Sequence, residues 1–338
     1  MVESPKNLRD STGVLRDQLS DVLELIEVRG LLSGGFAVRG DWICSFDIED
    51  PIKMLAVVCG RLTLTADGHP PVELAPGDVA ILSGCAHAVL EGGPGLEAPV
   101  PLDVESSEHA FVRVDGAVTC TEADVIIGGH VDVNPIGEAL LAQALPPVGV
   151  VRAAAAEATN LHAILNRVLD EVTGNRIGSA FAVAQQGQLL LLEVLRAYLA
   201  QAQHLPPGWL RLLTDEALRP AVASMHEGPG KPWRLDELAR AAAMSRTTFA
   251  ERFRAVAGVP PLAYLISWRM QLARQALRNK DTRVGPLAFA LGYNSESAFS
   301  NAFKREVGMS PLRYRASLDA ERSPNPRAPA RLPPTGSG

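Results

Sequence analysis

A pattern of helix, tight turn and helix occurs twice in the last third of this chain, and the repeat restricts the possible folds more than any other feature. In the first copy, residues 233–257, an apolar stripe precedes a short turn, and Ser245 stands where a helix N-cap is needed. Ser295 holds the same position in the second copy, and Gly258 and Gly308 end the two second helices. The repeat predicts two helix-turn-helix motifs in one all-α domain. The aromatic residues expected in its core are Phe249, Phe253, Phe299 and Phe303.

One continuous helical segment, from Pro261 to about Arg278, separates the two motifs. Proline is accepted in a first helical turn because the N–H that it lacks has no partner there. A segment of about 18 residues at ~1.5 Å each forms a rod of ~27 Å. Successive major grooves on one face of B-DNA recur every ~34 Å, so two helices held at this separation can enter neighbouring grooves. The spacing predicts that one polypeptide reads two adjacent half-sites on double-stranded DNA.

Charge is distributed unevenly along the chain. Residues 228–317 contain 15 Lys and Arg against 6 Asp and Glu, whereas residues 1–227 contain 14 against 30. We therefore expect only the basic segment to meet a polyanion. A single basic side chain is more often a solvated surface charge, and it is the joint excess that favours contact with phosphates. The phosphate-contact candidates are Arg246, Arg252, Arg254, Lys304 and Arg305, with Arg269 and Arg274 on the connecting helix as further ones.

Residues 233–316 resemble the DNA-binding domain of the AraC/XylS family of transcription regulators. The similarity is carried by LARAAAMSRTTFAERFRAVAGVPPLAYL, WRMQLARQAL and LAFALGYNSESAFSNAFKREVGMSPLRYR, and the final GMSPLRYR is its most specific part. The resemblance implies that each motif presents its second helix to base edges in the major groove. The base-reading residues that it implies are Thr247, Ala250 and Glu251 in the first motif, and Glu296, Ser297 and Asn301 in the second.

Three residues depart from the pattern of the family. Glu251 and Asn301 stand where members commonly have Arg, which favours guanine. Because Glu can accept from cytosine N4 and Asn can pair with adenine, we expect a different operator. Ala243 replaces a frequent Gly in the first turn, which costs up to about 1 kcal/mol if the position needs a positive φ.

The segment between residues 36 and 133 consists of short β-rich runs broken by Gly, Pro and Asp, which predicts a β-sandwich or small barrel. The turn Pro76-Gly77-Asp78, the strand after it and the stretch from Gly84 to His87 resemble the cupin-like sensor domains that precede such DNA-binding domains. The resemblance covers residues 8–135. Examples of the β-rich runs are Trp42–Phe46, Met54–Val58, Arg61–Thr65, Val79–Leu82, Phe111–Val114 and Val125–Ile127.

Enzymatic cupins carry an H-x-H pair and a Glu on an earlier strand, but residues 54–65 contain neither His nor Glu. Only His87 stands where a metal-cupin His is found, and one imidazole cannot hold a metal alone. We therefore expect no metal, no cofactor and no catalytic residues. An effector pocket is the alternative use of this region, and core packing is the competing interpretation. The residues that would line such a pocket are Trp42, Cys44, Phe46, Cys85 and His87.

Two Ala/Leu-rich stretches, 157–173 and 179–203, show helical apolar spacing and could pair with a second copy or pack onto the cupin-like domain. The four cysteines form no C-x-x-C pair, so buried reduced thiols are expected, with a redox role as the alternative. No long apolar run or secretory leader is present, which favours a cytoplasmic protein without a membrane partner. The predicted layout is a sensor domain at 8–135, a helical connector at 136–227, the DNA-binding domain at 228–317 and a disordered tail at 318–338.

Together these patterns predict an α+β protein with a cupin-like N-terminal β-sandwich or barrel, a helical connector and a C-terminal all-α double helix-turn-helix domain. We interpret it as a homodimeric transcription regulator modulated by a small molecule or a redox signal, with RNA polymerase as a further possible partner. A cupin metalloenzyme, such as an isomerase or dioxygenase, fused to a DNA-binding domain is one alternative. A constitutive regulator whose sensor is only a dimer scaffold is another, and filling of the pocket by Trp42 and Phe46 would favour it. The sequence leaves the effector, the operator and activation versus repression open.

Overall fold

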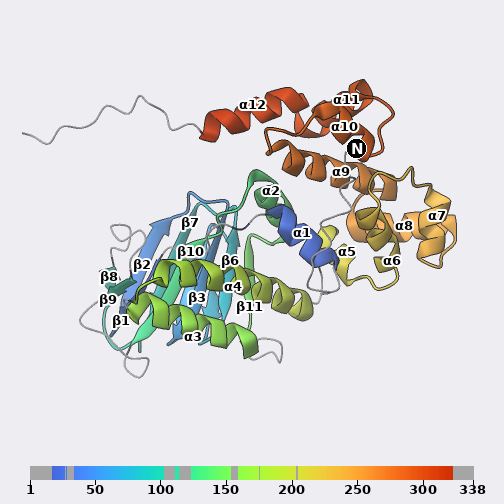
Figure 1. Ribbon diagram of the computed structural model, residues 1–338. Coiled ribbons are helices and arrows are strands. Elements are labelled where there is room, and N and C mark those ends of the chain that lie inside the picture. The colour runs from blue at the N-terminus through green and yellow to red at the C-terminus, as the bar shows by residue number, and fades with distance from the viewer. Residues whose placement is uncertain are drawn as a thin grey trace, which may run out of the picture. The chain divides into compact units, whose positions relative to one another are not determined.

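The computed structural model describes residues 17–26, 28, 34–102, 111–113, 123–153, 159–174, 176–202 and 205–322. These residues form two compact units (Figure 1). The β-rich unit contains residues 17–219 and 251–259, and the helical unit contains residues 220–250 and 260–322. Cys120 and most of the predicted disordered tail, residues 323–338, lie outside the described part of the chain. The α+β fold class predicted from the sequence is confirmed.

Two sheets make up the body of the β-rich unit. The six-stranded sheet has the order β11-β6-β3-β10-β1-β9, and the five-stranded sheet has the order β5-β4-β7-β2-β8. Within each sheet most neighbours are antiparallel, but β9 pairs parallel to β1 and β8 pairs parallel to β2. The strands are β1 (Gly34–Val38), β2 (Trp42–Asp47), β3 (Ile52–Cys59), β4 (Leu62–Ala66), β5 (Val72–Leu74), β6 (Val79–Ser83), β7 (His87–Gly92), β8 (Val100–Leu102), β9 (Phe111–Arg113), β10 (Asp124–His130) and β11 (Val148–Val151).

A large apolar core containing residues of both sheets lies within the β-rich unit. Strand β2 alternates strictly between inward and outward residues, and its inward set is Trp42, Cys44 and Phe46. Trp42 is fully buried, packs edge-on against Phe36 with ring centroids 5.2 Å apart, and donates from Nε1 to Asp124 at 2.6 Å. The predicted β-sandwich is thus confirmed, and side chains occupy the space between its sheets.

Two long helices, α3 (Thr159–Gly174) and α4 (Ser179–Gln201), pack against each other and lie on the six-stranded sheet, α3 at β3 and α4 at β11 (Figure 1). Leu169 of α3 packs against the small cluster that contains Cys59. Both helices were predicted, but strand β11 was not. Strand β11 lies inside the segment that was expected to be wholly helical. It was missed because its pairing with β6 is a long-range contact, and its four residues alone do not indicate a strand.

The turn Pro76-Gly77-Asp78 joins β5 to β6 along the chain, and its side chains contact the segment that follows β11. Gly77 has φ of +85°, and a Cβ there would overlap the imidazole of His162. Asp78 is 3% exposed and accepts hydrogen bonds from Ala153 N at 2.8 Å and Arg152 Nη1 at 2.9 Å. The turn that carries the cupin resemblance is therefore a buried anchor. The remaining helices of this unit are α1 (Gln18–Ile26), α2 (Pro135–Ala144) and α5 (Trp209–Thr214).

The helical unit is built around one central helix, α9 (Pro261–Leu277), whose buried face includes Trp268 and Leu277. His226 stacks on the ring of Trp268 with centroids 3.7 Å apart, and its Nε2 lies 2.8 Å from the hydroxyl of Tyr264. Its other helices are α6 (Arg219–Glu227), α7 (Leu235–Ala241), α8 (Arg246–Ala257), α10 (Val284–Ala290), α11 (Glu296–Val307) and α12 (Pro311–Arg322), although part of α8 groups with the β-rich unit.

Candidate nucleic-acid interface

The first helix-turn-helix motif consists of α7, the turn at 243–245 and α8. Ser245 accepts a hydrogen bond from Thr248 N at 3.2 Å, so one free backbone N–H of the first turn of α8 is satisfied, as the sequence predicts. Phe249 and Phe253 are fully buried, and Gly258 follows the helix with φ of +77°. These contacts fix α8 from its inner side and leave its other face in solvent.

The second motif repeats this construction with α10, the turn at 291–295 and α11. Ser295 accepts from Ala298 N at 3.1 Å, and Gly308 closes the helix with φ of +85°. Phe299 and Phe303 are fully buried in a cluster that also contains Tyr314. The twin capped helices predicted from the sequence are therefore confirmed, and one helix of 17 residues, α9, separates the two motifs.

The side chains that the resemblance assigns to base reading lie on the outer faces of α8 and α11. Ala250 is half-buried, and the others are exposed. Among them are a hydroxyl, two carboxylates and an amide, which together can donate to and accept from base edges. The exposed set is Thr247, Glu251, Glu296, Ser297 and Asn301. Their contact with bases stays a prediction.

The phosphate-contact candidates differ in how strongly they are held. Within the described residues, Arg254 and Lys304 are exposed and have no ion-pair partner. Arg246 lies 3.5 Å from Asp236, and Arg305 lies 3.6 Å from Glu306. Both pairs are open to solvent and are worth little, so these arginines can exchange their carboxylate for a phosphate at small cost.

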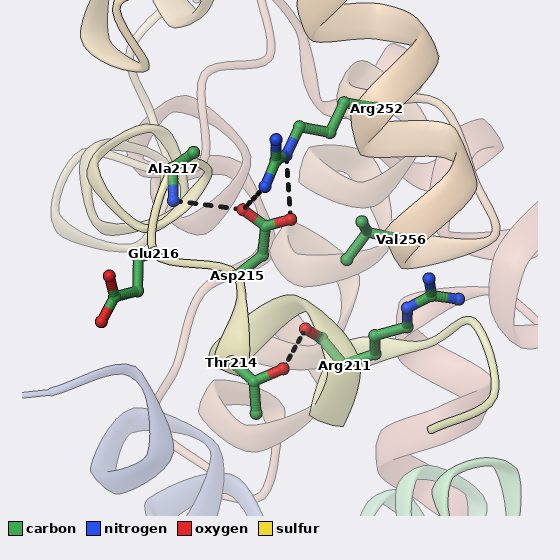
Figure 2. A pocket seen from close by; sticks show the side chains of 7 residues that line it. All are labelled: Arg211, Thr214, Asp215, Glu216, Ala217, Arg252 and Val256. Carbon is green, nitrogen blue, oxygen red and sulfur yellow. Dashed lines mark hydrogen bonds and ion pairs between the residues drawn. The ribbon is translucent and has the colours of Figure 1, made fainter. Parts of the chain in front are cut away.

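Arg252 is held more firmly, as Figure 2 shows. Its Nε and Nη2 donate to the two carboxylate oxygens of Asp215, each at 3.0 Å. The Asp215 side chain is 9% exposed and also accepts from Ala217 N and Leu218 N. A bidentate pair with a buried carboxylate is strong and directional. Arg252 therefore has to leave Asp215 before it can reach a phosphate, which the sequence did not indicate because the two residues lie on different elements.

Arg269, one of the further phosphate-contact candidates, makes internal hydrogen bonds in the structure. It donates from Nε to Pro229 O at 2.6 Å and from Nη2 to Lys231 O at 2.9 Å. Arg274 is also turned inward, with its guanidinium 5.6 Å from the centroid of the Tyr314 ring. Both residues lie on α9 and are half-buried.

The five residues considered for an effector pocket do not line one site. Trp42, Cys44, Phe46 and Cys85 belong to the packed core between the sheets. His87 lies on the opposite, outer face of its sheet, with Nδ1 at 2.8 Å from Asp47 Oδ1 and Nε2 at 3.0 Å from Ser45 Oγ. The physical reason is strand alternation, because His87 begins β7 on its outward-facing side while Ala88 and Leu90 point inward.

The cysteines only partly follow the expectation of reduced thiols. Cys44 and Cys85 are buried thiols that take part in no disulfide, as predicted. Cys59, in contrast, is disulfide-bonded. Burial raises the pKa of the Cys85 thiol, which reduces its reactivity. In the described part of the chain, no group of three or more His, Cys, Asp or Glu residues is arranged to hold a metal ion.

Ala243 occupies a left-handed backbone conformation, with φ of 52°, at the position where the second motif has Gly292 with φ of +81°. We expect Ala243→Gly to raise the free energy of unfolding by up to about 1 kcal/mol, because glycine adopts this conformation without strain. Chemical denaturation measures the change. Ala241→Gly, within α7, is the matched control and should destabilise. A loss of stability in both variants would contradict the assignment of strain to Ala243.

A filled β-sandwich followed by two capped helix-turn-helix motifs defines a class of DNA-binding regulators. The family described as Cupin matches residues 17–200, and the family described as Helix-turn-helix domain matches residues 238–317. The chain is 35% identical over 303 residues to an AraC-like transcription regulator of Streptomyces lividans, covering 88% of this chain and 98% of that one. This chain belongs to the AraC-like transcription regulators, with a cupin N-terminal domain and a DNA-binding helix-turn-helix C-terminal domain.

Other matches cover a smaller share of the chain. The transcriptional regulator AlkR of Acinetobacter baylyi is 40% identical over 127 residues, which is 38% of this chain and 41% of AlkR. Among solved structures, the DNA-binding domain of AdpA in complex with a target DNA is 36% identical, with a TM-score of 0.31, and the match covers 32% of this chain and 97% of that one. Within the described residues, no helix has the length and apolar character needed to cross a membrane.

Proposed function

We propose that this regulator reads two adjacent DNA half-sites, with α8 and α11 entering successive major grooves on one face of the duplex. The observation that carries the proposal is the pair of Ser-capped helices with exposed polar faces, separated by the single helix α9. At ~1.5 Å per residue, this rod is ~25 Å long. Because one polypeptide holds both reading helices, binding of the first places the second over the neighbouring groove.

The proposal divides the exposed residues into two roles. Thr247, Glu251 and Asn301 are among those that read bases, because their side chains offer directional donors and acceptors. Arg254 and Lys304 bind phosphates and set the register of the protein on the duplex. All five of these residues lie on α8 or α11.

In vitro selection of bound sequences from a random DNA library, followed by footprinting, tests this function. The expected consensus contains two blocks about one helical turn apart, both protected on the same face of the duplex. A single conserved block, with protection of one groove segment, would contradict the two-half-site proposal.

Asn301→Ala and Lys304→Ala should separate the two roles. The first variant is expected to lose about 1–3 kcal/mol on the selected operator and to relax specificity at one base pair. The second should weaken binding to operator and random DNA alike and reduce the slope of log K against log salt by about 1. Titrations at several salt concentrations measure both effects. Equal losses on both kinds of DNA for both variants would contradict the division.

We assign the β-rich unit to regulation of DNA binding by a redox signal or a small molecule. The disulfide of Cys59 supports a redox signal, whereas the core that Trp42 and Phe46 fill supports the alternative of a sensor reduced to a scaffold. Operator titrations of the oxidised and the reduced full chain distinguish these functions. A difference in affinity supports the redox signal. Equal affinities, together with no change in a screen of small molecules, support the scaffold.

The proposed working form is a cytoplasmic homodimer that also contacts RNA polymerase at promoters. Self-association is supported by large apolar side chains that are exposed to solvent in the first turn of α4 and just before this helix. Phe181 is 74% exposed, and Ile177 is fully exposed. Sedimentation of the full chain over a range of concentrations tests it, and a monomer at all concentrations would contradict it.

A further inference from the structure

The linker that precedes the first helix-turn-helix motif, residues 228–233, forms an ordered loop within the helical unit. Lys231 N and Trp233 Nε1 both donate to Gly228 O, at 3.1 and 2.8 Å. The ammonium of Lys231 lies 3.7 Å from the centroid of the Trp233 ring and 3.3 Å from a carboxylate oxygen of Glu237. A loop with this many internal contacts keeps one conformation, and it does not act as a flexible tether.

Arg269 fastens this loop to the central helix. Its guanidinium donates to the carbonyl oxygens of Pro229 and Lys231, which lie on either side of Gly230. The same guanidinium lies 5.8 Å from the centroid of the Tyr293 ring, in the turn of the second motif. Arg269 is half-buried, and its burial is offset by the two carbonyl acceptors and the aromatic face.

Two glycines bring the linker and the second turn into backbone contact. A Cβ on Gly230 would overlap the carbonyl oxygen of Ala290, and a Cβ on Gly292 would overlap the carbonyl oxygen of Gly230. Gly292 also needs its φ of +81°, but Gly230 has no such requirement. The glycine at position 230 is therefore needed for close approach alone.

A row of aromatic rings continues from this junction beneath α11. Tyr293 meets Phe299 edge-on with centroids 5.5 Å apart, and Phe299 lies 5.8 Å from Phe303. Phe303 in turn meets Tyr314 of α12 at 5.7 Å. Because close-packed rings transmit displacement, the position of the linker fixes the position of Tyr293 and, through it, of the second reading helix.

We propose that Arg269 is a positioning residue for DNA recognition: it clamps the linker onto the turn of the second motif and so fixes α11 relative to the first motif. The linker is then part of the reading machinery, although it precedes both motifs in the sequence. This inference rests on the proposed reading of two half-sites. It predicts that loss of the clamp changes how strictly the protein measures half-site spacing.

Two variants of the full chain break the clamp in different ways. Gly230→Ala pushes the linker away from the second turn and leaves every charge in place. Its matched control is Gly228→Ala, where the nearest atoms to the new Cβ are 3.6 Å or more away. Arg269→Lys keeps the charge but cannot span both carbonyls with a planar fork, so a purely electrostatic role predicts wild-type behaviour for it.

The measurement compares the affinity for the selected operator with the affinity for an operator that has one extra base pair between the half-sites. For wild-type protein and Gly228→Ala, the insertion should lower the affinity strongly, because a rigid protein cannot follow the displaced groove. For Gly230→Ala and Arg269→Lys the affinity for the correct spacing should fall about tenfold, and the insertion penalty should shrink by a similar factor. Binding to a single half-site should stay at the wild-type level.

The outcomes separate the clamp from the proposed function. If the wild-type protein shows no spacing preference, the reading of two half-sites fails. If the wild-type protein shows a spacing preference and both clamp variants lose as much affinity on insertion as the wild type, the proposed role of Arg269 is wrong and the proposed function stands. A variant that also loses binding to a single half-site has lost its fold, and the other variant then decides the question. If both lose it, the contacts of Arg269 serve folding and not spacing, which overturns the inference.

Discussion

Replacing Phe299 with alanine is expected to lower the stability of the helical unit by about 3–5 kcal/mol. Phe299 is fully buried and packs between Tyr293 and Phe303. Its removal opens a cavity under α11 that the neighbouring rings cannot fill without leaving their own contacts. Because the outer face of α11 carries Asn301, the affinity for the two-half-site operator should fall together with stability, while binding to the first half-site is retained.

Hydrogen exchange of backbone amides in the native state measures this change within the helical unit, which matters because a chain of two units need not unfold in one step. Phe289→Ala is the matched control. It removes the same group from α10, but Phe289 is 62% exposed, so the change should stay within about 0.5 kcal/mol. A result in which the two variants cost the same would mean that the ring of Phe299 does not hold α11 in place.

The helical unit could be predicted from the sequence because its signals are local. Ser245 and Ser295 cap helices within three residues of themselves, and the buried phenylalanines recur at helical spacing. Even the strain at Ala243 follows from a single position in a turn. The bounds of α8 and α11 were therefore accessible without any tertiary information.

The β-rich unit was predicted as a class but not strand by strand. The runs named as examples correspond to six strands, and five others were not singled out: β1, β5, β7, β8 and β11. Of these five, β11 lies in the segment that was expected to be helical. Strand β11 is defined by its register with β6, in which Val148 pairs with Leu82. Such pairing depends on the folded sandwich, so the local amino-acid composition of a short strand gives little indication of it.

The same limit applies to the candidate site. The charge of Arg252 and Arg269 is evident in the sequence, but their roles depend on acceptors 37 and 38–40 residues away. A basic residue at the DNA-binding end of the chain was therefore assigned to phosphates by default. One signal was available for Arg269, which stands between the buried residues Trp268 and Met270 of α9. An arginine flanked by buried residues on a helix is a candidate for an internal contact.

Inserting five base pairs between the two half-sites of the selected operator is expected to lower the affinity by about 10²–10³-fold. Half a helical turn moves the second half-site to the opposite face of the duplex, out of reach of α11. The loss corresponds to the base contacts of one reading helix, at about 1–3 kcal/mol for each good contact. The same insertion placed outside the half-sites is the control and should leave the affinity unchanged.

A ten-base-pair insertion distinguishes a rigid reader from a tethered one. It returns the second half-site to the original face but moves it ~34 Å further along the duplex. A continuous helix of 17 residues cannot stretch to follow, so the affinity should stay as low as with five base pairs. Two motifs joined by a flexible tether would instead recover much of the affinity, since the tether could span the added distance. Recovery at ten base pairs would therefore show that α9 does not hold the two reading helices at a fixed separation.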